Sequence, residues 1–195
     1  MISLAGGAFA HGEPHPAHQQ QTTPVVASAP LPFAMGGAFN LIDQNGQARS
    51  QIDPDGRAQL VFFGYANCPG ICPTAFATMA DTVDRLAEQG IPVRPILITV
   101  DPTRDTVTNM GAPLARLHPD FIGLTGSEAA LAQAYKAFGV ESKVEYTDPD
   151  KGAIYSHGSF IFLLDAQGEV LTLLPPILHT DRMVEIVRGY LTATD

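Results

Sequence analysis

Residues 62–76 read FFGYANCPGICPTAF and join a strand to a helix through a loop that holds both cysteines of the chain. The segment that leads into it, AQLVFFGYA at 58–66, is short, apolar and rich in β-formers, which predicts a buried strand. After the loop, apolar residues recur at helical spacing and predict a helix of about four turns that ends near Gly90 and Pro92. Pro73 suits the first turn of this helix, where no amide donor is needed. The cysteine loop is therefore expected to connect a buried strand to a helix N-terminus.

The rest of the chain continues this alternation of strands and helices. Further strands are predicted at residues 93–101, 121–126, 140–148 and 159–174, the last as a hairpin that turns at 166–168. Further helices are predicted at 105–117 with an interruption near Gly111 and Pro113, at 127–139 with Ser127 as N-cap, and at 180–191 capped by Thr180 or Asp181. Asn45-Gly46 predicts a hairpin turn before the first long strand. This order predicts an α/β fold in which helices cover both faces of a central sheet.

Composition and charge limit the classes of partner. The 195 residues suit one domain with a tail, and the hydrophobic content of 45% is enough for a core. Acidic residues outnumber basic ones 20 to 11, which gives a formal net charge of −9. Because this charge would repel nucleic-acid phosphates, we expect no nucleic-acid partner. We expect a monomer.

The N-terminal segment differs from the rest in composition. Residues 1–34 contain few large apolar side chains and cannot build a packed core, so we interpret them as a flexible tether and residues 35–195 as the folded domain. Ala8-Phe9-Ala10 is similar to a signal-peptidase site, although no basic residue precedes Arg49. Either this segment is an ordinary flexible start, or it is the remainder of a signal or anchor whose beginning the sequence lacks. We favour the second interpretation, which predicts a periplasmic or otherwise exported protein attached to a membrane through the missing segment.

Three histidines lie close together in this tether. His11, His15 and His18 could collect copper or zinc weakly, since imidazole is a ligand for both metals. The simpler interpretation is a solvated linker with incidental histidines, and we favour it.

The cysteines, Cys68 and Cys72, are separated by three residues. A helix N-terminus carries a partial positive charge and free amide donors, so we expect it to lower the pKa of a nearby thiol. Gly70 lets the loop bend, and the three-residue gap leaves room for both sulfurs to face one ion. A purely structural disulfide would close a loop of only about five residues and would stabilise the fold little. A redox couple and a metal site both remain open at this point.

Four blocks of the sequence carry a resemblance to a known family. FGYANCPGICP at 63–73 resembles the signature F-G-[YF]-x-x-C-P-x-x-C-P of the Sco/SenC family, the copper-delivery proteins of respiratory oxidase assembly. Three further blocks of this chain resemble segments of that family and follow in the same order. They are LITVDPTRDT at 97–106, HPDFIGLTGS at 118–127 and YSHGSFIFLLDAQGE at 155–169. The resemblance covers roughly residues 35–193, and the combination is far more specific than C-x-x-x-C alone.

The resemblance implies a thioredoxin-like fold with an added N-terminal β-hairpin, and a copper site made by Cys68, Cys72 and His157. Two positions depart from the family pattern. The residue after Cys-Pro is often Asp and is Gly70 here, and the residue before the histidine is often Asp and is Ser156 here. Both changes remove a carboxylate beside the implied site. We therefore expect copper affinity, oxidation-state preference or partner docking to differ from typical members.

The chemistry of the residues agrees with copper. Soft thiolates prefer Cu(I), imidazole accepts Cu(I) or Cu(II), and two cysteines in total exclude a Cys-rich zinc site. By itself, a lone histidine such as His157 is more often an ordinary polar residue at the entrance of a strand, and only the resemblance makes us favour it as a ligand. We expect His118 to cap a helix end, and His179 to lie at the surface before the last helix or to cap it.

The loop after the second buried strand also holds charged residues at the sheet edge where sites gather. It is either a turn held by its own side chains or part of the rim of the site, and it contains Asp101, Pro102, Arg104 and Asp105.

Two functions are compatible with these residues. The first is a metallochaperone that binds one copper ion and delivers it to the dinuclear copper site of cytochrome c oxidase, with other copper chaperones or thiol reductants as further partners. The alternative is a thiol-disulfide oxidoreductase that reduces the cysteines of the oxidase, with Cys68 and Cys72 as catalytic residues. A peroxidase of the same broad fold is disfavoured, because neither cysteine lies in the pattern P-x-x-x-[TS]-x-x-C.

Overall fold

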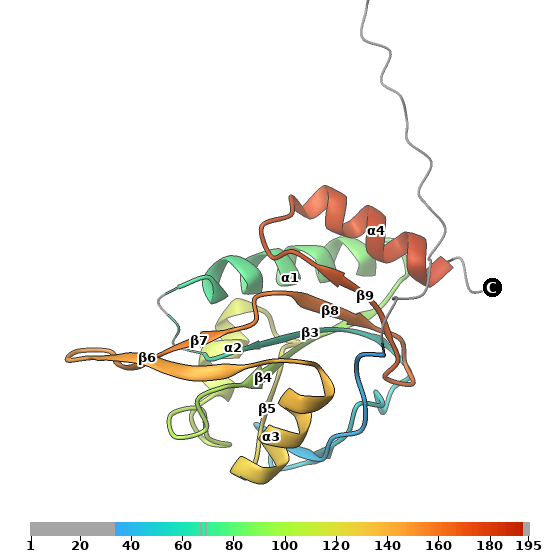
Figure 1. The fold of residues 1–195 in the computed structure, drawn as a ribbon. Helices are drawn as coiled ribbons and strands as arrows, with labels where there is room; N and C mark the ends of the chain where they lie inside the picture. The colour runs from blue at the N-terminus through green and yellow to red at the C-terminus, as the bar shows by residue number, and fades with distance from the viewer. Residues whose placement is uncertain (1–33, 67, 69, 193–195) are drawn as a thin grey trace, which may run out of the picture.

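A computed structural model describes residues 34–66, 68 and 70–192 (Figure 1). The tether histidines and Ala8-Phe9-Ala10 lie outside these residues. The strands are β1 Leu41–Asp43, β2 Ala48–Arg49, β3 Ala58–Gly64, β4 Val93–Thr99, β5 Ile122–Thr125, β6 Ser142–Asp148, β7 Gly152–His157, β8 Ile161–Leu164 and β9 Val170–Leu174. The helices are α1 Cys72–Ala87, α2 Gly111–Leu117, α3 Glu128–Ala137 and α4 Thr180–Thr192.

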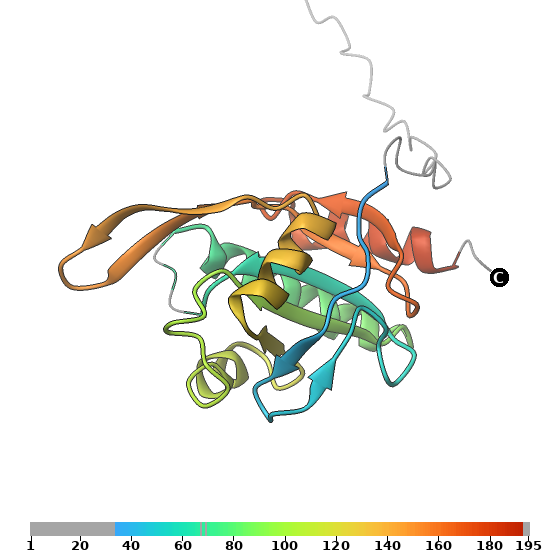
Figure 2. The ribbon, with the colours of Figure 1, turned by 60° about the horizontal axis from the view of Figure 1, so that its bottom comes forward.

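The central sheet has the strand order β2-β1-β5-β4-β3-β8-β9. Strands β3, β4 and β5 are parallel, whereas β1 pairs antiparallel with β5 and β8 pairs antiparallel with β3. Helices α1 and α4 pack together over one face of the sheet, and α3 covers the other face (Figures 1 and 2). The predicted α/β sheet with helices on both faces and an N-terminal hairpin, β1–β2, is therefore confirmed.

Strand β3 lies at the centre of the sheet, and every one of its residues is buried. Its side chains alternate between the two faces, as the pleat of a strand requires. Phe62 meets Phe76 of α1 edge to face at 5.8 Å between ring centroids, and Phe63 meets Phe138, at the end of α3, at 5.3 Å. Both faces are covered, which explains why this strand reads as a continuous apolar run.

Two helices differ from the prediction at their starts. Helix α2 begins only at Gly111, because Asp105 is buried and its carboxylate accepts hydrogen bonds from Ala66 N and Thr99 Oγ1 instead of starting a helix. Helix α4 begins at Thr180, so the cap lies one residue earlier than predicted. The carbonyl of His179 accepts the first amide bonds of this helix. Ser127 caps α3 as predicted, accepting from Ala130 N at 3.2 Å.

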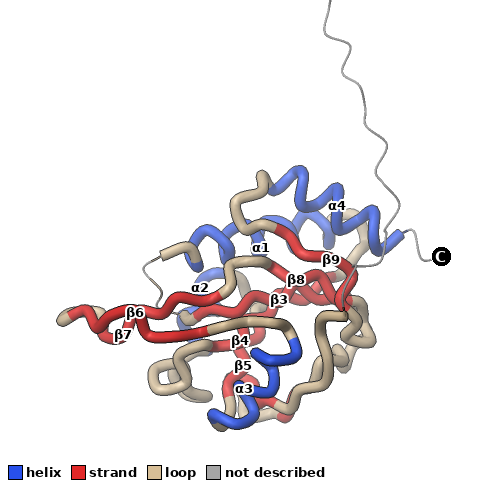
Figure 3. Tube along the Cα trace, viewed as in Figure 1, coloured by secondary structure: helices blue, strands red, loops and turns tan. Residues whose placement is uncertain are grey.

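Strand β7 was not expected from the sequence. It pairs antiparallel with β6 in a separate two-stranded sheet, with Ser142 opposite His157. This hairpin projects from the body of the molecule (Figures 2 and 3). His157 therefore stands at the end of β7 and not, as predicted, at the entrance of the next strand. None of the described helices is both long enough and apolar enough to cross a membrane.

Candidate metal centre

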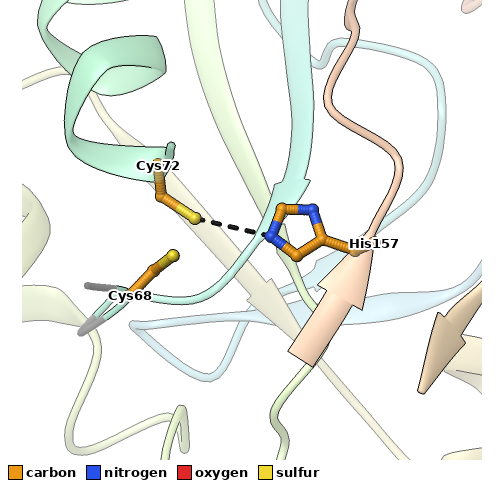
Figure 4. Close-up of side chains that lie close together, drawn as sticks. All are labelled: Cys68, Cys72 and His157. Carbon is orange, nitrogen blue, oxygen red and sulfur yellow. Dashed lines mark hydrogen bonds between the residues drawn. The ribbon is translucent and has the colours of Figure 1, made fainter. Parts of the chain in front are cut away.

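The two cysteines and one histidine come together at the end of β3. Cys68 lies in the loop after β3, Cys72 is the first residue of α1, and His157 ends β7. One ligand atom from each of these residues, two sulfurs and one ring nitrogen, lies within 4.8 Å of the others (Figure 4). Among the described residues, no other Cys, His, Asp or Glu joins this group. Two segments that are distant in sequence, the cysteine loop with the start of α1 and the end of β7, thus form one cluster of soft ligands.

The orientation of the His157 ring follows from its hydrogen bonds. Its Nδ1 lies 2.9 Å from the carbonyl oxygen of Gly158, which can only accept, so Nδ1 carries the proton. In the neutral ring Nε2 is then an acceptor, and it shares a hydrogen bond of 3.6 Å with the sulfur of Cys72 (Figure 4). A backbone carbonyl that holds one ring nitrogen is the usual way of presenting the other to a metal. The ring is therefore prepared to bind a metal through Nε2.

The two thiols differ in acidity. A hydrogen bond from the Cys72 thiol holds the pKa of Cys68 well below its usual value, outweighing the effect of burial. The same shared proton, together with burial, raises the pKa of the fully buried Cys72. A lowered thiol pKa is therefore found for Cys68 and not for Cys72, and its largest cause is the Cys72 side chain and not, as predicted, the helix N-terminus. At neutral pH the pair carries one thiolate, on Cys68, and one thiol, on Cys72.

Two glycines allow the sulfurs to sit where they do. The amide of Gly70 donates to the Cys68 sulfur at 3.3 Å. A Cβ atom added at Gly64 would lie 3.1 Å from the Cys72 sulfur and 2.8 Å from Cε1 of Phe62, closer than a well-packed core tolerates. The need for a glycine at position 64 was not predicted. The signal that could have revealed it is its place in the F-G-Y block, directly before the cysteine loop.

A cleft of about 430 Å³ opens beside this group. It lies between the cysteine loop and the β6–β7 hairpin, and its walls include Tyr65, Cys68, Ile71, Tyr146, Ile154 and His157. Cys68 is half-buried at its edge, whereas Cys72 is buried beneath. A molecule that enters the cleft therefore meets Cys68 and His157 first.

The model of the SCO1/SenC family matches residues 27–192. The chain belongs to the SCO1/SenC family. A SCO2-like protein of Rickettsia conorii is 39% identical over 156 residues, which cover 80% of this chain and 76% of that protein.

Solved structures share the fold of this SCO1/SenC protein. Arabidopsis thaliana ScoI with copper bound superposes with a TM-score of 0.75 at 26% identity, covering 82% of this chain and 99% of that chain. BsSco has a TM-score of 0.60 at 25% identity, and the match covers 84% of this chain and 96% of that chain. It is described as a member of the Sco family of cytochrome c oxidase assembly proteins that contains a disulfide switch. The thioredoxin-like class is confirmed. The Cys-Cys-His group of this chain has the donors that suit copper.

The two departures from the SCO1/SenC pattern have visible surroundings. Gly70 contributes its amide to Cys68 in place of a side chain. Ser156 lines the cleft, and its hydroxyl, together with Lys143, lowers the pKa of Glu145 on the neighbouring strand. A carboxylate is therefore present beside Ser156, supplied by β6.

The loop after β4 links the site to the hairpin. Asp101 is buried and accepts hydrogen bonds from Thr103, Arg104 and the hydroxyl of Tyr155. Arg104 also donates to the carbonyls of Lys151 and Ala153 on the hairpin. The first expectation for this loop is therefore correct, because its own side chains hold it, and it reaches the cleft only through its bonds to Tyr155 and Lys151.

The remaining described histidines lie outside the group. Nε2 of His118 donates to Asp84 at 3.0 Å, and its Nδ1 accepts from the amide of Asp120 at 3.1 Å, so this ring ties a helix end to α1. The prediction that His118 caps a helix end is therefore correct in place, but its ring bonds to a carboxylate and a backbone amide and not to helix carbonyls. His179 is exposed at the surface beside Asp181, as predicted.

Proposed function

We propose that this protein binds one copper ion through Cys68, Cys72 and His157 and delivers it to the dinuclear copper site of cytochrome c oxidase. The observation that supports this most directly is that an unprotonated ring nitrogen of His157 and the two cysteine sulfurs lie within 4.8 Å of one another. Two soft sulfurs and one imidazole form a three-coordinate set that suits Cu(I). With one more ligand or a water, the same set accommodates Cu(II).

The cleft beside the group supports a delivery role. A three-ligand site leaves room for a ligand of the recipient to bind before the original ligands leave. Cys68 is at the edge of the cleft and Cys72 is buried, so the recipient would first replace the outer sulfur. The recipient would be the copper-bearing subunit of the oxidase, in keeping with the oxidase-assembly role described for BsSco.

The test is a titration of the reduced protein with Cu(I) under a competing chelator. The unchanged protein should bind one ion, and His157→Ala should lose affinity by about 100-fold. His179→Ala is the matched control, because this ring is exposed and lies outside the group. Equal affinity in the protein and in His157→Ala would refute the proposed ligand set.

A second candidate, reduction of the oxidase cysteines, is favoured by the asymmetry of the thiols. The Cys68 thiolate would attack a disulfide of the oxidase and form a mixed disulfide, releasing one thiolate. Cys72 would then lose its proton and attack Cys68, which frees the second oxidase thiol and leaves a Cys68–Cys72 disulfide. An external thiol reductant would restore the pair. Cys72→Ser should trap the mixed disulfide with an oxidised oxidase peptide, and failure to trap it would exclude this activity.

We also infer that the protein is exported to an oxidising compartment, with residues 35–195 as the folded domain. The support is the Ala8-Phe9-Ala10 site and the tether-like composition of residues 1–34. Cell fractionation of the natural gene product tests this, and recovery in the cytoplasm would refute it.

A further inference from the structure

His157 and the two cysteines are held by separate parts of the fold. Cys68 and Cys72 follow β3, at the centre of the seven-stranded sheet, whereas His157 ends β7 of the projecting two-stranded sheet. Within the part of the chain that the structure describes, no strand ladder joins the two sheets. Residues 158–160 connect His157 to β8, so they fix where β7 ends but not the direction in which the hairpin runs. Another contact has to hold the hairpin, and with it the imidazole, against the cysteine loop.

The turn after β4, residues 101–105, supplies contacts to the hairpin. The hydroxyl of Tyr155 donates to the buried carboxylate of Asp101 at 3.2 Å. Tyr155 lies two positions before His157, so both side chains leave the same face of β7. Arg104, which pairs with the same carboxylate, also donates to two backbone carbonyls of the hairpin. Asp101 therefore anchors the hairpin directly through Tyr155 and indirectly through Arg104.

The other end of the same turn holds the cysteine loop. Oδ2 of Asp105 accepts a hydrogen bond at 2.9 Å from the amide of Ala66, which lies two positions before Cys68. The hydroxyl of Thr99 donates to the same oxygen at 2.8 Å. Asp105 is 2% exposed, so water does not compete for these bonds. The start of the cysteine loop is therefore tied to the turn through one buried carboxylate.

The turn between these two contacts is itself held together by hydrogen bonds. The amides of Arg104 and Asp105 donate to the carbonyl of Asp101 at 3.2 and 2.9 Å. The hydroxyl of Thr103 donates to the Asp101 carboxylate at 2.6 Å. The amide of Asp101 donates to Thr99 Oγ1 at 2.9 Å. The hairpin and the cysteine loop are thus bonded to opposite ends of one internally bonded turn.

We propose that residues 101–105 form a clamp that sets the position of the His157 ring relative to the two sulfurs. Tyr155 and Asp105 are its positioning residues, and neither belongs to the group of metal ligands. The proposal deepens the copper-binding function proposed above and rests on it. Ligands that are held in place before the metal arrives lose less freedom on binding, so the clamp raises copper affinity. Releasing Tyr155 affects the histidine, whereas releasing Asp105 affects the cysteines.

The first variant is Tyr155→Phe, which keeps the ring and removes the hydroxyl that reaches Asp101. Its Cu(I) affinity under a competing chelator should fall about tenfold. In the His157→Ala background the same substitution should change nothing, because no imidazole remains to be positioned. Tyr190→Phe is the matched control, since it removes the same atom from α4, which Figure 1 shows away from the hairpin. Unchanged affinity in Tyr155→Phe, or equal losses in both backgrounds, would overturn the clamp, because a merely structural role does not depend on His157.

Substitutions at Asp105 test the other end of the clamp. Asp105→Ala removes the acceptor of the Ala66 amide and should lower Cu(I) affinity about tenfold, with His157 present or replaced by alanine. Asp105→Asn keeps an oxygen that can accept this bond and should restore most of the affinity. If Asp105→Asn binds copper as weakly as Asp105→Ala, the bond to Ala66 does not position the cysteines and this end of the clamp is refuted.

A measurement without copper separates failure of the clamp from failure of the proposed function. In the reduced, metal-free protein the rings of Tyr65 and Tyr155 meet edge to face at 5.5 Å between centroids. The nuclear Overhauser effects between these rings should weaken in Tyr155→Phe, because the hairpin is no longer held by Asp101. Unchanged effects would refute the clamp whether or not the protein binds copper. If the protein binds no copper but the effects weaken as expected, the copper function fails while the clamp on the hairpin stands.

Discussion

Nε2 of His157 lies 3.6 Å from the sulfur of Cys72, although 85 positions separate the two residues in the chain. The carbonyl of Gly158 fixes the ring so that the unprotonated nitrogen points at this sulfur. The ligand set is therefore largely formed before a metal arrives. A preformed set reduces the ordering that binding would otherwise require.

The unequal acidity of the thiols predicts how many protons copper displaces. Cys68 has a lowered pKa and is already a thiolate, whereas Cys72 has a raised pKa and keeps its proton. Copper should therefore displace about one proton from the thiols at about pH 8, where imidazoles are neutral. Affinity should rise about tenfold per pH unit while Cys72 stays protonated. Calorimetry in buffers of different ionisation enthalpy measures this number, and release of two protons would contradict the assignment.

Gly64→Ala should weaken copper binding as well as stability. The added Cβ would lie 3.1 Å from the Cys72 sulfur, and the buried Phe62 leaves it no room to move. We expect a loss of about 1–3 kcal/mol in the free energy of unfolding, measured by denaturant titration. Gly123→Ala is the control, because its Cβ would meet Leu114 and Met110 away from the site. If both variants lose equal stability and neither loses copper affinity, the close approach at Gly64 has no role in binding.

Arg104→Lys should loosen the β6–β7 hairpin. Arginine donates to the carbonyls of both Lys151 and Ala153, and lysine cannot reproduce this forked geometry. Hydrogen exchange of the β6 and β7 amides should become about tenfold faster, and copper affinity should fall because His157 ends β7. The exposed Arg182, which pairs with Glu185, provides the control Arg182→Lys. Unchanged exchange in the hairpin would show that other contacts hold it.

Substitutions at Asp105 should separate the cost of its charge from the value of its hydrogen bonds. Burial raises its pKa, so the charged carboxylate costs stability at neutral pH, and this cost disappears as pH falls through its folded-state pKa. Asp105→Asn should be at least as stable as the unchanged protein at neutral pH. Asp105→Ala should lose about 1–3 kcal/mol, because Ala66 N and Thr99 lose their acceptor. Thermal unfolding of both variants measures this, and a large loss in Asp105→Asn would contradict it.

The negative charge of Asp53 should stabilise the fold, whereas the charge of Asp105 destabilises it. Burial acts to raise the pKa of Asp53, but hydrogen bonds from Arg94 and from the amides of Arg57 and Asp55 outweigh it and hold the pKa below the ordinary value. Its stabilisation is therefore present above about pH 4 and is lost as pH falls through the lowered folded-state pKa. Asp53→Asn should cost roughly 3 kcal/mol at neutral pH, and the difference should shrink towards about pH 2. A pH-independent difference would show that charge is not the cause.

Local patterns were sufficient for most of the fold. The apolar run of β3, the helical spacing of α1 and the N-cap at Ser127 each depend on neighbours a few residues away, and each was predicted correctly. Strand β7 was missed, because Gly152–His157 is neither buried nor regularly alternating and is held in place by Arg104. The late start of α2 was missed for the same kind of reason, since Asp105 bonds to the distant Ala66.

The amino-acid sequence alone determined that two cysteines stand at the junction of a buried strand and a helix, because spacing and propensity are local properties. Only the tertiary structure decided which proton sits where. The tautomer of His157, the thiolate on Cys68 and the thiol on Cys72 each depend on contacts that the folded sheet and its projecting hairpin bring together. The physical reason is that proton positions follow from distances and burial across the fold, and sequence spacing does not contain them.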